Sequence, residues 1–219
     1  VSTPVLRGGE VVALIGPNGS GKSSLMKRIA GLASGPGTVE LHNARKRDIG
    51  YMPQDHASTA ALTVYESVIL AAKQEAGWRV SDAELARIDE TLDALGIAPL
   101  AFRDLSALSG GQRQLVSIAQ TLIREPKILI RDEPTSALDL NRQMEVMRFV
   151  RRTARTRNMA VLISLHDLNQ VLRFADQAMV MAAGRLHACG PCREVITETM
   201  MREVYRVEAR LEPCSRGMH

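Results

Sequence analysis

A glycine-rich segment near the start of the chain has the spacing of a phosphate-binding loop. Gly16 is followed by four residues and then by Gly21, Lys22 and Ser23, between an apolar run and a helical pattern. Glycines allow successive backbone N–H groups to point at phosphate oxygens, and the start of a helix adds its positive end. Lys22 is expected to reach the β- and γ-phosphates of a nucleotide, and the Ser23 hydroxyl to bind Mg²⁺. The residues expected to bind the nucleotide are Gly16, Pro17, Asn18, Gly19, Ser20, Gly21, Lys22, Ser23 and Ser24.

Two acidic residues, Asp132 and Glu133, directly follow the apolar segment 128–131. In open parallel sheets, ligands bind beyond the carboxyl ends of the strands. Asp132 can hold Mg²⁺ there, directly or through water, and Glu133 can orient and deprotonate an attacking water. An apolar run followed by two carboxylates is a weak signal alone. Together with the phosphate-binding loop it predicts a site that hydrolyses a nucleotide.

A second glycine-rich segment, made of Leu108, Ser109, Gly110, Gly111 and Gln112, precedes another helical pattern. Like the first loop, it offers backbone N–H groups and a hydroxyl to an anion. One nucleotide rarely needs two separate cradles on a single chain. We therefore predict that this segment contacts a nucleotide bound to a second copy of the chain, in a homodimer.

With these motifs the chain resembles, over essentially all of its length, the nucleotide-binding subunit of ATP-binding-cassette (ABC) transporters. Residues 108–112 match the signature motif of that family. The resemblance implies an ATPase in which Gln54 contacts Mg²⁺ and the attacking water, and in which His166 contacts the γ-phosphate. It also implies that residues 136–139 cross the dimer interface. That loop consists of Ser136, Ala137, Leu138 and Asp139, and the residues expected at Mg²⁺ are Ser23, Gln54 and Asp132.

Two further segments narrow the resemblance to importers of ferric siderophores, haem and cobalamin. They are residues 165–170, Leu-His-Asp-Leu-Asn-Gln, and residues 201–207, Met-Arg-Glu-Val-Tyr-Arg-Val. The resemblance implies integral-membrane permease subunits as partners and, indirectly, a periplasmic substrate-binding protein. It also implies a peripheral position on the cytoplasmic face of the bacterial inner membrane. The expected permease dock is a surface groove near residues 54–105.

The motifs are expected to sit on an α/β fold, because strand and helix patterns alternate at both ends of the chain. We predict a P-loop NTPase (RecA-like) core with a parallel sheet, residues 1–54 and 106–219. An α-helical subdomain is inserted at residues 55–105, and all 219 residues form a single ABC ATPase domain. The expected strands cover residues 11–15, 38–42, 48–52, 128–131, 160–164, 177–182 and 185–189. The expected helices cover residues 22–33, 64–75, 82–95, 111–124, 140–156 and 167–175.

Composition excludes several classes of protein. The 28 Lys and Arg against 24 Asp and Glu give a net charge of +4, without the dense basic stripe of a nucleic-acid-binding protein. No apolar run approaches the roughly 18 residues of a membrane span. Three cysteines are typical of a reducing compartment. We therefore expect an intracellular protein that binds no nucleic acid.

Other functions stay open. The chain could be a nucleotide-binding ABC-type module with impaired hydrolysis, or a soluble ABC ATPase without a role in transport. A soluble ABC protein of DNA repair or translation would need long insertions, for which 219 residues leave no room. A phosphate-loop kinase or GTPase would lack residues 108–112 and His166.

Three features depart from the ABC pattern. No Phe, Trp or Tyr precedes Tyr51, whereas relatives usually stack an aromatic residue on adenine. The chain begins at Val1, where relatives have further N-terminal strands, and therefore looks truncated; without the aromatic residue, its nucleotide affinity is expected to be lower by about tenfold or more. The short segment 31–54 predicts a reduced antiparallel β region. Arg131 occupies a strand position that is normally apolar, so its charge must find a carboxylate or reach solvent.

Cys189 and Cys192 have the spacing of a thioredoxin-type redox pair, between a strand and a helical pattern. At this place the ABC family has a plain Gly-x-Pro turn. We therefore expect the two cysteines to have no redox function.

Overall fold

Six strands form one twisted sheet in the computed structural model, which describes residues 2–52, 61–73, 79–132 and 138–212. The strand order is β2-β3-β4-β1-β5-β6, with parallel pairing from β2 to β5 and antiparallel pairing between β5 and β6. This confirms the predicted α/β class. The strands are β1 (Val11–Ile15), β2 (Ile49–Met52), β3 (Ile128–Arg131), β4 (Ala160–Ser164), β5 (Gln177–Ala182) and β6 (Arg185–Pro191).

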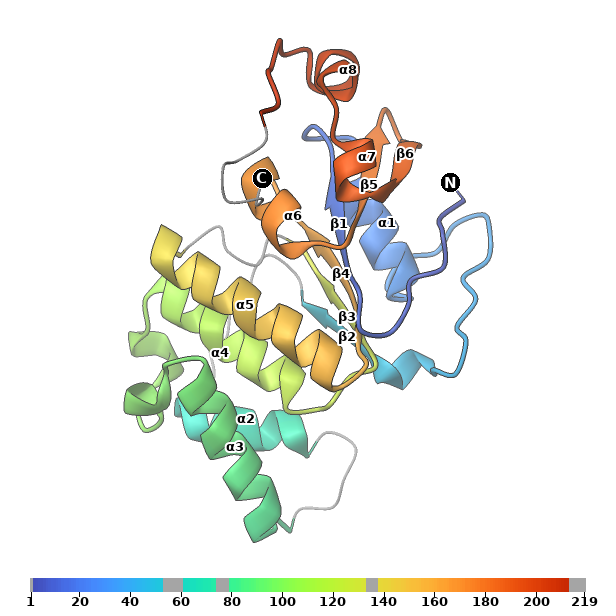
Figure 1. The fold of residues 1–219 in the computed structure, drawn as a ribbon. Helices are drawn as coiled ribbons and strands as arrows, with labels where there is room; N and C mark the ends of the chain where they lie inside the picture. Colours follow the sequence, from blue (N-terminus) through green and yellow to red (C-terminus); the bar gives the residue numbers. More distant parts are fainter. Residues whose placement is uncertain (1, 53–60, 74–78, 133–137, 213–219) are drawn as a thin grey trace.

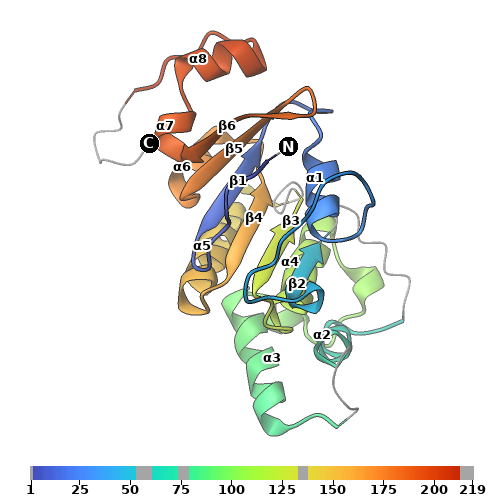
Figure 2. The same cartoon turned by 90° about the vertical axis from the view of Figure 1, so that its right-hand side faces the viewer.

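Helices cover both faces of the sheet, because the side chains of each buried strand alternate between two apolar cores. In β1, Val11, Ala13 and Ile15 face one core, and Val12 and Leu14 face the other. Figures 1 and 2 show α4 and α5 side by side over the first face, and α1 on the opposite face. These helices are α1 (Lys22–Ile29), α4 (Gly110–Leu122), α5 (Leu140–Thr156) and, also on the first face, α6 (Leu168–Phe174).

A helical lobe stands away from the sheet and packs on it mainly through α4 (Figure 1). It contains α2 (Val64–Ala72) and α3 (Asp82–Ala94), each with a capping box at its start. Thr63 and Glu66 cap α2, and Ser81 and Glu84 cap α3. These capping residues determine where both helices begin. Lys73, at the end of α2, forms an ion pair with Glu84 at 2.6 Å. The division of the chain at residues 55 and 105 stays a prediction.

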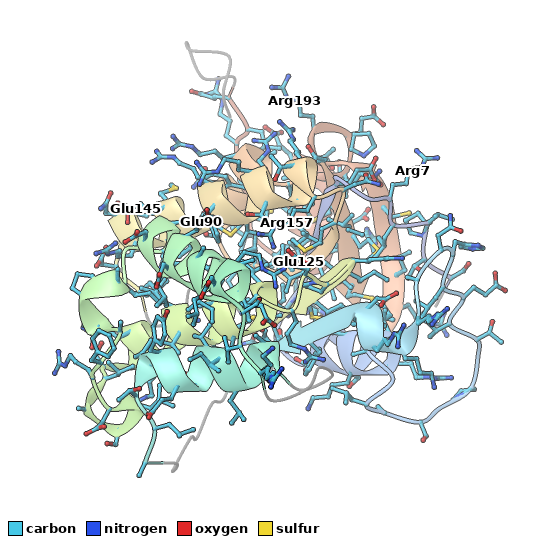
Figure 3. The ribbon with its side chains drawn as sticks, turned by 90° about the horizontal axis from the view of Figure 1, so that it is seen from below. Arg7, Glu90, Glu125, Glu145, Arg157 and Arg193 are labelled. Carbon is cyan, nitrogen blue, oxygen red and sulfur yellow. The ribbon has the colours of Figure 1, made fainter. Side chains whose placement is uncertain are left out.

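The chain after the sheet returns toward the carboxyl end of β1. It forms α7 (Cys192–Val195), α8 (Glu198–Met200) and one π-helical turn, η4 (Met201–Tyr205), which Figure 1 shows above the sheet. Charged side chains point outward over the surface, as Arg7, Glu90 and Arg193 do in Figure 3. None of the helices in the described part of the chain is long and apolar enough to cross a membrane.

The predicted strand at residues 38–42 is wrong: these residues are described, and they form no strand. Arg28 of α1 donates hydrogen bonds to the carbonyls of Gly35 (2.9 Å) and Gly37 (2.7 Å), which hold the residues just before this segment as a loop beside the helix. The helix predicted for residues 22–33 ends earlier, at Ile29. Gly31 takes a φ of +75°, which stops the helix with a glycine in the left-handed region.

Candidate functional site: a phosphate-binding loop at the end of four neighbouring strands

The sequence motifs follow strands that lie next to one another in the sheet. The phosphate-binding loop follows β1, His166 follows β4, and Asp132 follows β3. The order β2-β3-β4-β1 makes these strands consecutive, and their parallel pairing puts all their carboxyl ends at one edge. Gln54 comes two residues after β2. Gln54, Glu133, Ser136 and Ala137 lie outside the described residues.

The glycines of the loop have backbone conformations that side chains disfavour. Gly16, Gly19 and Gly21 have φ values of +144°, +76° and +98°. A Cβ on Gly16 would lie 2.1 Å from the Met181 carbonyl oxygen of β5, so this position has no room for a side chain. Gly19 has no atom within 4 Å of its Cβ position, which leaves open space over the loop. This combination suits a loop that must bring backbone N–H groups close to a ligand.

Lys22, the first residue of α1, folds back over the loop. Its Nζ donates hydrogen bonds to the carbonyls of Gly16 (2.8 Å) and Pro17 (3.0 Å), and its side chain is buried. A buried ammonium held beside open N–H groups favours an anion at the loop. The buried Ser20 hydroxyl has no hydrogen-bond partner among the described residues, so it too is available to a ligand. The loop therefore fits a bound phosphate chain.

The residues expected to hold Mg²⁺ also fit that role where they are described. The Ser23 and Ser24 side chains are exposed next to the loop, and Asp132 lies at the carboxyl end of β3. Burial raises the pKa of the Tyr51 phenol, and the Asp132 carboxylate raises it further, so that carboxylate faces the same side of the sheet as Tyr51. Within the described ranges, no three His, Cys, Asp or Glu side chains gather as a metal site. A Mg²⁺ bound through phosphate and hydroxyl oxygens needs no such cluster.

The second glycine-rich segment starts α4, on the opposite face of the sheet from α1. Ser109 caps this helix: its Oγ accepts from the Gln112 N–H at 3.2 Å, and its N–H donates to the Gln112 Oε1 at 2.9 Å. Leu108 is buried, whereas Ser109 and Gly110 are exposed. The exposed start of a 13-residue helix thus points away from the core, as a contact with another molecule requires.

Two glutamines, Gln170 (buried) and Gln143 (partly buried), connect the His166 segment to the predicted interface loop, a link that the sequence analysis missed. Gln170 of α6 donates to the Gln143 side chain of α5 at 2.6 Å, and Gln143 donates to the Leu138 carbonyl at 2.8 Å. Asp139 caps α5 by accepting from the Arg142 N–H at 2.9 Å. The sequence signal that could have indicated this contact is the position of both glutamines on the inward faces of two amphipathic helices.

Tyr205, from the distant η4 turn, also contacts the loop. Burial raises the pKa of its phenol, and a hydrogen bond from the Gly16 backbone opposes that rise. No local pattern predicts this contact, because 189 positions separate the two residues. The end of the described chain thus helps to support the first residue of the phosphate-binding loop.

Arg131 does not reach solvent: only 3% of the residue is exposed. Its Nη1 lies 3.1 Å from the Met52 sulfur, on the neighbouring strand β2. Burial lowers the pKa of the guanidinium to about 9, so it remains charged at neutral pH. The sequence analysis expected the Arg131 charge either to find a carboxylate or to reach solvent, and contact with solvent is therefore excluded.

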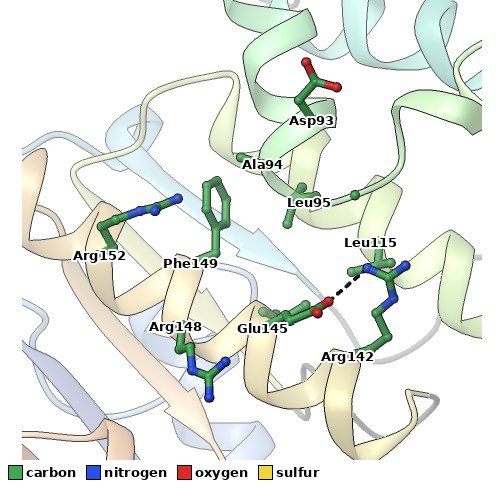
Figure 4. Close-up of a pocket in the computed structure, with 11 residues that line it drawn as sticks. Asp93, Ala94, Leu95, Leu115, Arg142, Glu145, Arg148, Phe149 and Arg152 are labelled. Carbon is green, nitrogen blue, oxygen red and sulfur yellow. Dashed lines mark hydrogen bonds and ion pairs between the residues drawn. The ribbon is translucent and has the colours of Figure 1, made fainter.

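A cavity between three helices lies away from the loop. It has a volume of about 430 Å³ and opens between α3, α4 and α5, where Phe149 and Arg152 line it together with the Arg142–Glu145 ion pair (Figure 4).

Cys189 and Cys192 do not have the geometry of a thioredoxin-type pair. Cys189 belongs to β6, paired with Met179, and Cys192 starts a helix of only four residues. Burial raises the pKa of the Cys192 thiol to about 11, whereas a redox cysteine needs a lowered value.

A parallel sheet with a phosphate-binding loop after its central strand defines the class of P-loop nucleotide-binding proteins. Within that class, the family model described as ABC transporter matches residues 4–136. The chain belongs to the ABC transporter family.

Relatives and solved structures agree with this assignment. The chain is 38% identical over 223 residues to the hemin import ATP-binding protein HmuV of Bradyrhizobium diazoefficiens, covering 92% of this chain and 80% of the relative. It is similar to a metal-chelate type ABC transporter solved in an inward-facing conformation, with 30% identity, a TM-score of 0.81, and coverage of 92% and 79%. It is also similar to the bacterial ABC transporter cassette MJ0796 in a dimeric structure, with 27% identity, a TM-score of 0.76, and coverage of 87% and 88%.

Proposed function

We propose that the chain is the ATP-hydrolysing subunit of a bacterial ABC importer. The observation that carries this proposal is the meeting of three motifs at one sheet edge, where the phosphate-binding loop, Asp132 and His166 follow neighbouring parallel strands. Such an edge is where α/β proteins bind ligands. Membership of the ABC family supports ATP as that ligand.

In this proposal, Glu133 accepts a proton from the water that attacks the γ-phosphate in line. Lys22 offsets the negative charge that develops on the phosphate oxygens, and His166 contacts the γ-phosphate. Mg²⁺, when bound, would neutralise charge on the phosphates, held by Ser23, Gln54 and Asp132.

The complete site needs a second chain. We propose that two copies face each other head to tail, so that Ser109, Gly110 and Gly111 of one contact the ATP held by the other. Leu108 and Gln112 lie on either side of these three residues in the sequence. The interface is crossed by the loop made of Ser136, Ala137, Leu138 and Asp139. ATP then stabilises the dimer and hydrolysis opens it. The similar dimeric cassette supports this arrangement.

The proposed partners are integral-membrane permease subunits and, indirectly, a periplasmic substrate-binding protein. The cargo would be an iron–siderophore, haem or cobalamin-type metal chelate, as the hemin-import relative and the metal-chelate type transporter suggest. The chain would then lie on the cytoplasmic face of the inner membrane. The helical lobe would transmit the opening of the dimer to the permease.

Two alternatives differ in a measurable way. The buried Arg131 beside Asp132 favours a second candidate, an ABC-type module with impaired hydrolysis. A soluble ABC ATPase without a role in transport would hydrolyse ATP but would not respond to a permease.

The test is ATP turnover by the purified chain at several protein concentrations, beside Glu133→Gln. Turnover that rises faster than linearly with concentration, and is lost in the variant, supports a composite dimeric ATPase. Binding of Mg-ATP without turnover at any concentration, including after addition of permease in membranes, contradicts the enzymatic part of the proposal. Turnover that is linear in concentration contradicts the composite site.

A further inference from the structure

The cavity between α3, α4 and α5 combines apolar and charged side chains in its lining (Figure 4). Leu95, Leu115 and Val146 line it and are buried, and Phe149 lines it but is only partly buried. Its volume of about 430 Å³ lies within the range of about 300–1,000 Å³ that small-molecule pockets have. Such pockets are mostly apolar and contain a few polar groups that orient the ligand. The lining and the size of this cavity therefore suit a small organic molecule.

The cavity lies where the helical lobe meets the helices that cover the sheet. The turn after α3 contributes Leu95 and Gly96, and α5 contributes the facing side chains. Gly96 has a φ of +65°, and a Cβ on it would lie 2.8 Å from the Arg142 Nη1. The Arg142 guanidinium of α5 thus lies against the backbone that follows the lobe helix. A molecule in the cavity would therefore contact both the lobe and the core of the chain.

Four charged side chains around the cavity are paired or point away from its aromatic ring. The Arg142 Nη1 forms an ion pair with the Glu145 Oε2 at 2.9 Å. In Figure 4, the side chains of Asp93 and Arg148 point away from the Phe149 ring. These four side chains therefore leave no unbalanced charge beside the ring.

Arg152 differs from these four residues. Its guanidinium carbon lies 5.7 Å from the centre of the Phe149 ring, and it forms no ion pair with any residue that the structure describes. Arg148, one helical turn earlier, carries the same charge, and like charges four positions apart on a helix repel each other. An anion beside Arg152 would relieve this repulsion. Because a guanidinium is a flat, forked donor, it can hold an acid group through two hydrogen bonds.

We propose that this cavity binds a small aromatic acid with one negative charge. The acid group pairs with Arg152, and the ring packs against Phe149 and the buried Leu115. A single charge follows because Arg152 is the unbalanced charge beside the ring, and because Glu145 repels a second acid group. The bound acid ties the helical lobe to α5. No step of the proposed ATP hydrolysis uses this cavity, so the inference goes beyond that function.

The first measurement is a fluorescence titration of the nucleotide-free chain with anilinonaphthalene sulfonate, an aromatic monoanion. We expect saturable binding that Arg152→Gln weakens at least about tenfold, because the change removes the charge from an exposed side chain. Arg7→Gln is the matched control, because Arg7 is exposed and lies across the molecule from Glu145 (Figure 3), and it should bind like the wild type. The uncharged analogue phenylnaphthylamine should bind the wild type at least about tenfold more weakly. Absence of saturable binding, or equal affinity in Arg152→Gln, overturns the inference.

Glu145→Gln tests the sign of the charge effect. The change releases Arg142 from its ion pair and removes a carboxylate from the cavity lining. The affinity for the anionic probe should therefore rise about three- to tenfold, whereas that for phenylnaphthylamine should stay the same. An affinity for the anionic probe that is unchanged or lower contradicts the proposed balance of charges.

Hydrogen exchange locates the bound probe. The amides of Leu95, Gly96 and Ile97 are hydrogen-bonded to carbonyls of α3 at 2.9–3.2 Å. Saturation with the probe should slow their exchange at least about threefold, and exchange at the Ala30 amide, at the end of α1, should not change. Equal rates at residues 95–97 with and without the probe would place it elsewhere and overturn the inference. A chain that binds the probe here but does not hydrolyse ATP contradicts the proposed function alone.

Discussion

The Met181 carbonyl oxygen of β5 fills the space that a side chain on Gly16 would need, at 2.1 Å from the Cβ position. The loop residue also has a φ of +144°, so both its conformation and its surroundings require glycine. We predict that Gly16→Ala abolishes ATP binding and lowers the free energy of unfolding by about 2 kcal/mol or more, because the loop must move off β5. Calorimetric ATP titration and denaturant unfolding measure the two effects.

Gly19→Ala is the matched control for this stability effect. Gly19 also has a positive φ, of +76°, but no atom lies within 4 Å of its Cβ position. Its expected cost is only the conformational one, about 1–2 kcal/mol. A Gly16→Ala variant no less stable than Gly19→Ala would show that contact with β5 does not support the loop.

We predict that Phe102, an exposed aromatic residue on the helical lobe within the region expected to dock the permease, contacts the permease. Phe102 is 83% exposed and stacks on Tyr65 with the ring centroids 5.8 Å apart. We predict that Phe102→Ala changes the free energy of unfolding by less than about 0.5 kcal/mol, because the side chain is on the surface. It leaves ATP binding unchanged and lowers permease-stimulated turnover several-fold, measured in reconstituted vesicles. Leu32→Ala, at another exposed apolar residue, should not affect stimulation.

The Lys73–Glu84 ion pair gives the helical lobe a pH-dependent contact. Hydrogen bonds from Lys73 and from Ser81 lower the pKa of Glu84 to about 2. Because the pKa is lower in the folded state, the contact stabilises the lobe fully above about pH 4.5 and loses this effect as the pH falls toward 2. Carboxyl NMR titration should give a Glu84 pKa well below 4, and Lys73→Met should move it upward. An unchanged pKa in Lys73→Met would show that the pair does not act on Glu84.

Cys189 and Cys192 differ in exposure to solvent. Cys192 is buried, its thiol donates to the Ala175 carbonyl, and burial raises its pKa to about 11, whereas Cys189 is exposed. We predict that iodoacetamide at pH 8 modifies Cys189 in the folded protein and leaves Cys192 intact until the chain is unfolded. Peptide mapping by mass spectrometry separates the two sites. Rapid modification of Cys192, or an altered ATP turnover in Cys189→Ser, would reopen a redox function.

Local sequence signals were sufficient for the elements that carry the motifs. The helices expected to begin at residues 64, 82 and 111 begin within one residue of those positions as α2, α3 and α4, and the apolar runs at residues 11–15 and 160–164 are β1 and β4. The strand expected at residues 38–42 was wrong, because Arg28 ties the preceding glycines into a loop. Strand patterns indicate a strand only where a partner strand is available.

Contacts between distant positions could not be read from the sequence. The links from Arg131 to Met52, from Gln170 to Gln143 and from Tyr205 to Gly16 depend on strand order, register and helix rotation. None of these residues, judged by its neighbours in the sequence, indicates a long-range contact. The phosphate-binding loop, Asp132 and His166 follow neighbouring strands, whereas no motif indicates the contacts that hold these segments in place.

The central place of β1 has a consequence for how the protein is made. β1 leaves the ribosome well before its two neighbours, β4 and β5, which begin at residues 160 and 177, and Gly16 lies against Met181. Sequence separations this large make assembly slow, because long loops must close before the contacts form. A nascent chain that ends before β5 lacks the strand against which the Gly16 loop packs. The phosphate-binding loop can therefore take its final conformation only after β5 has been synthesised.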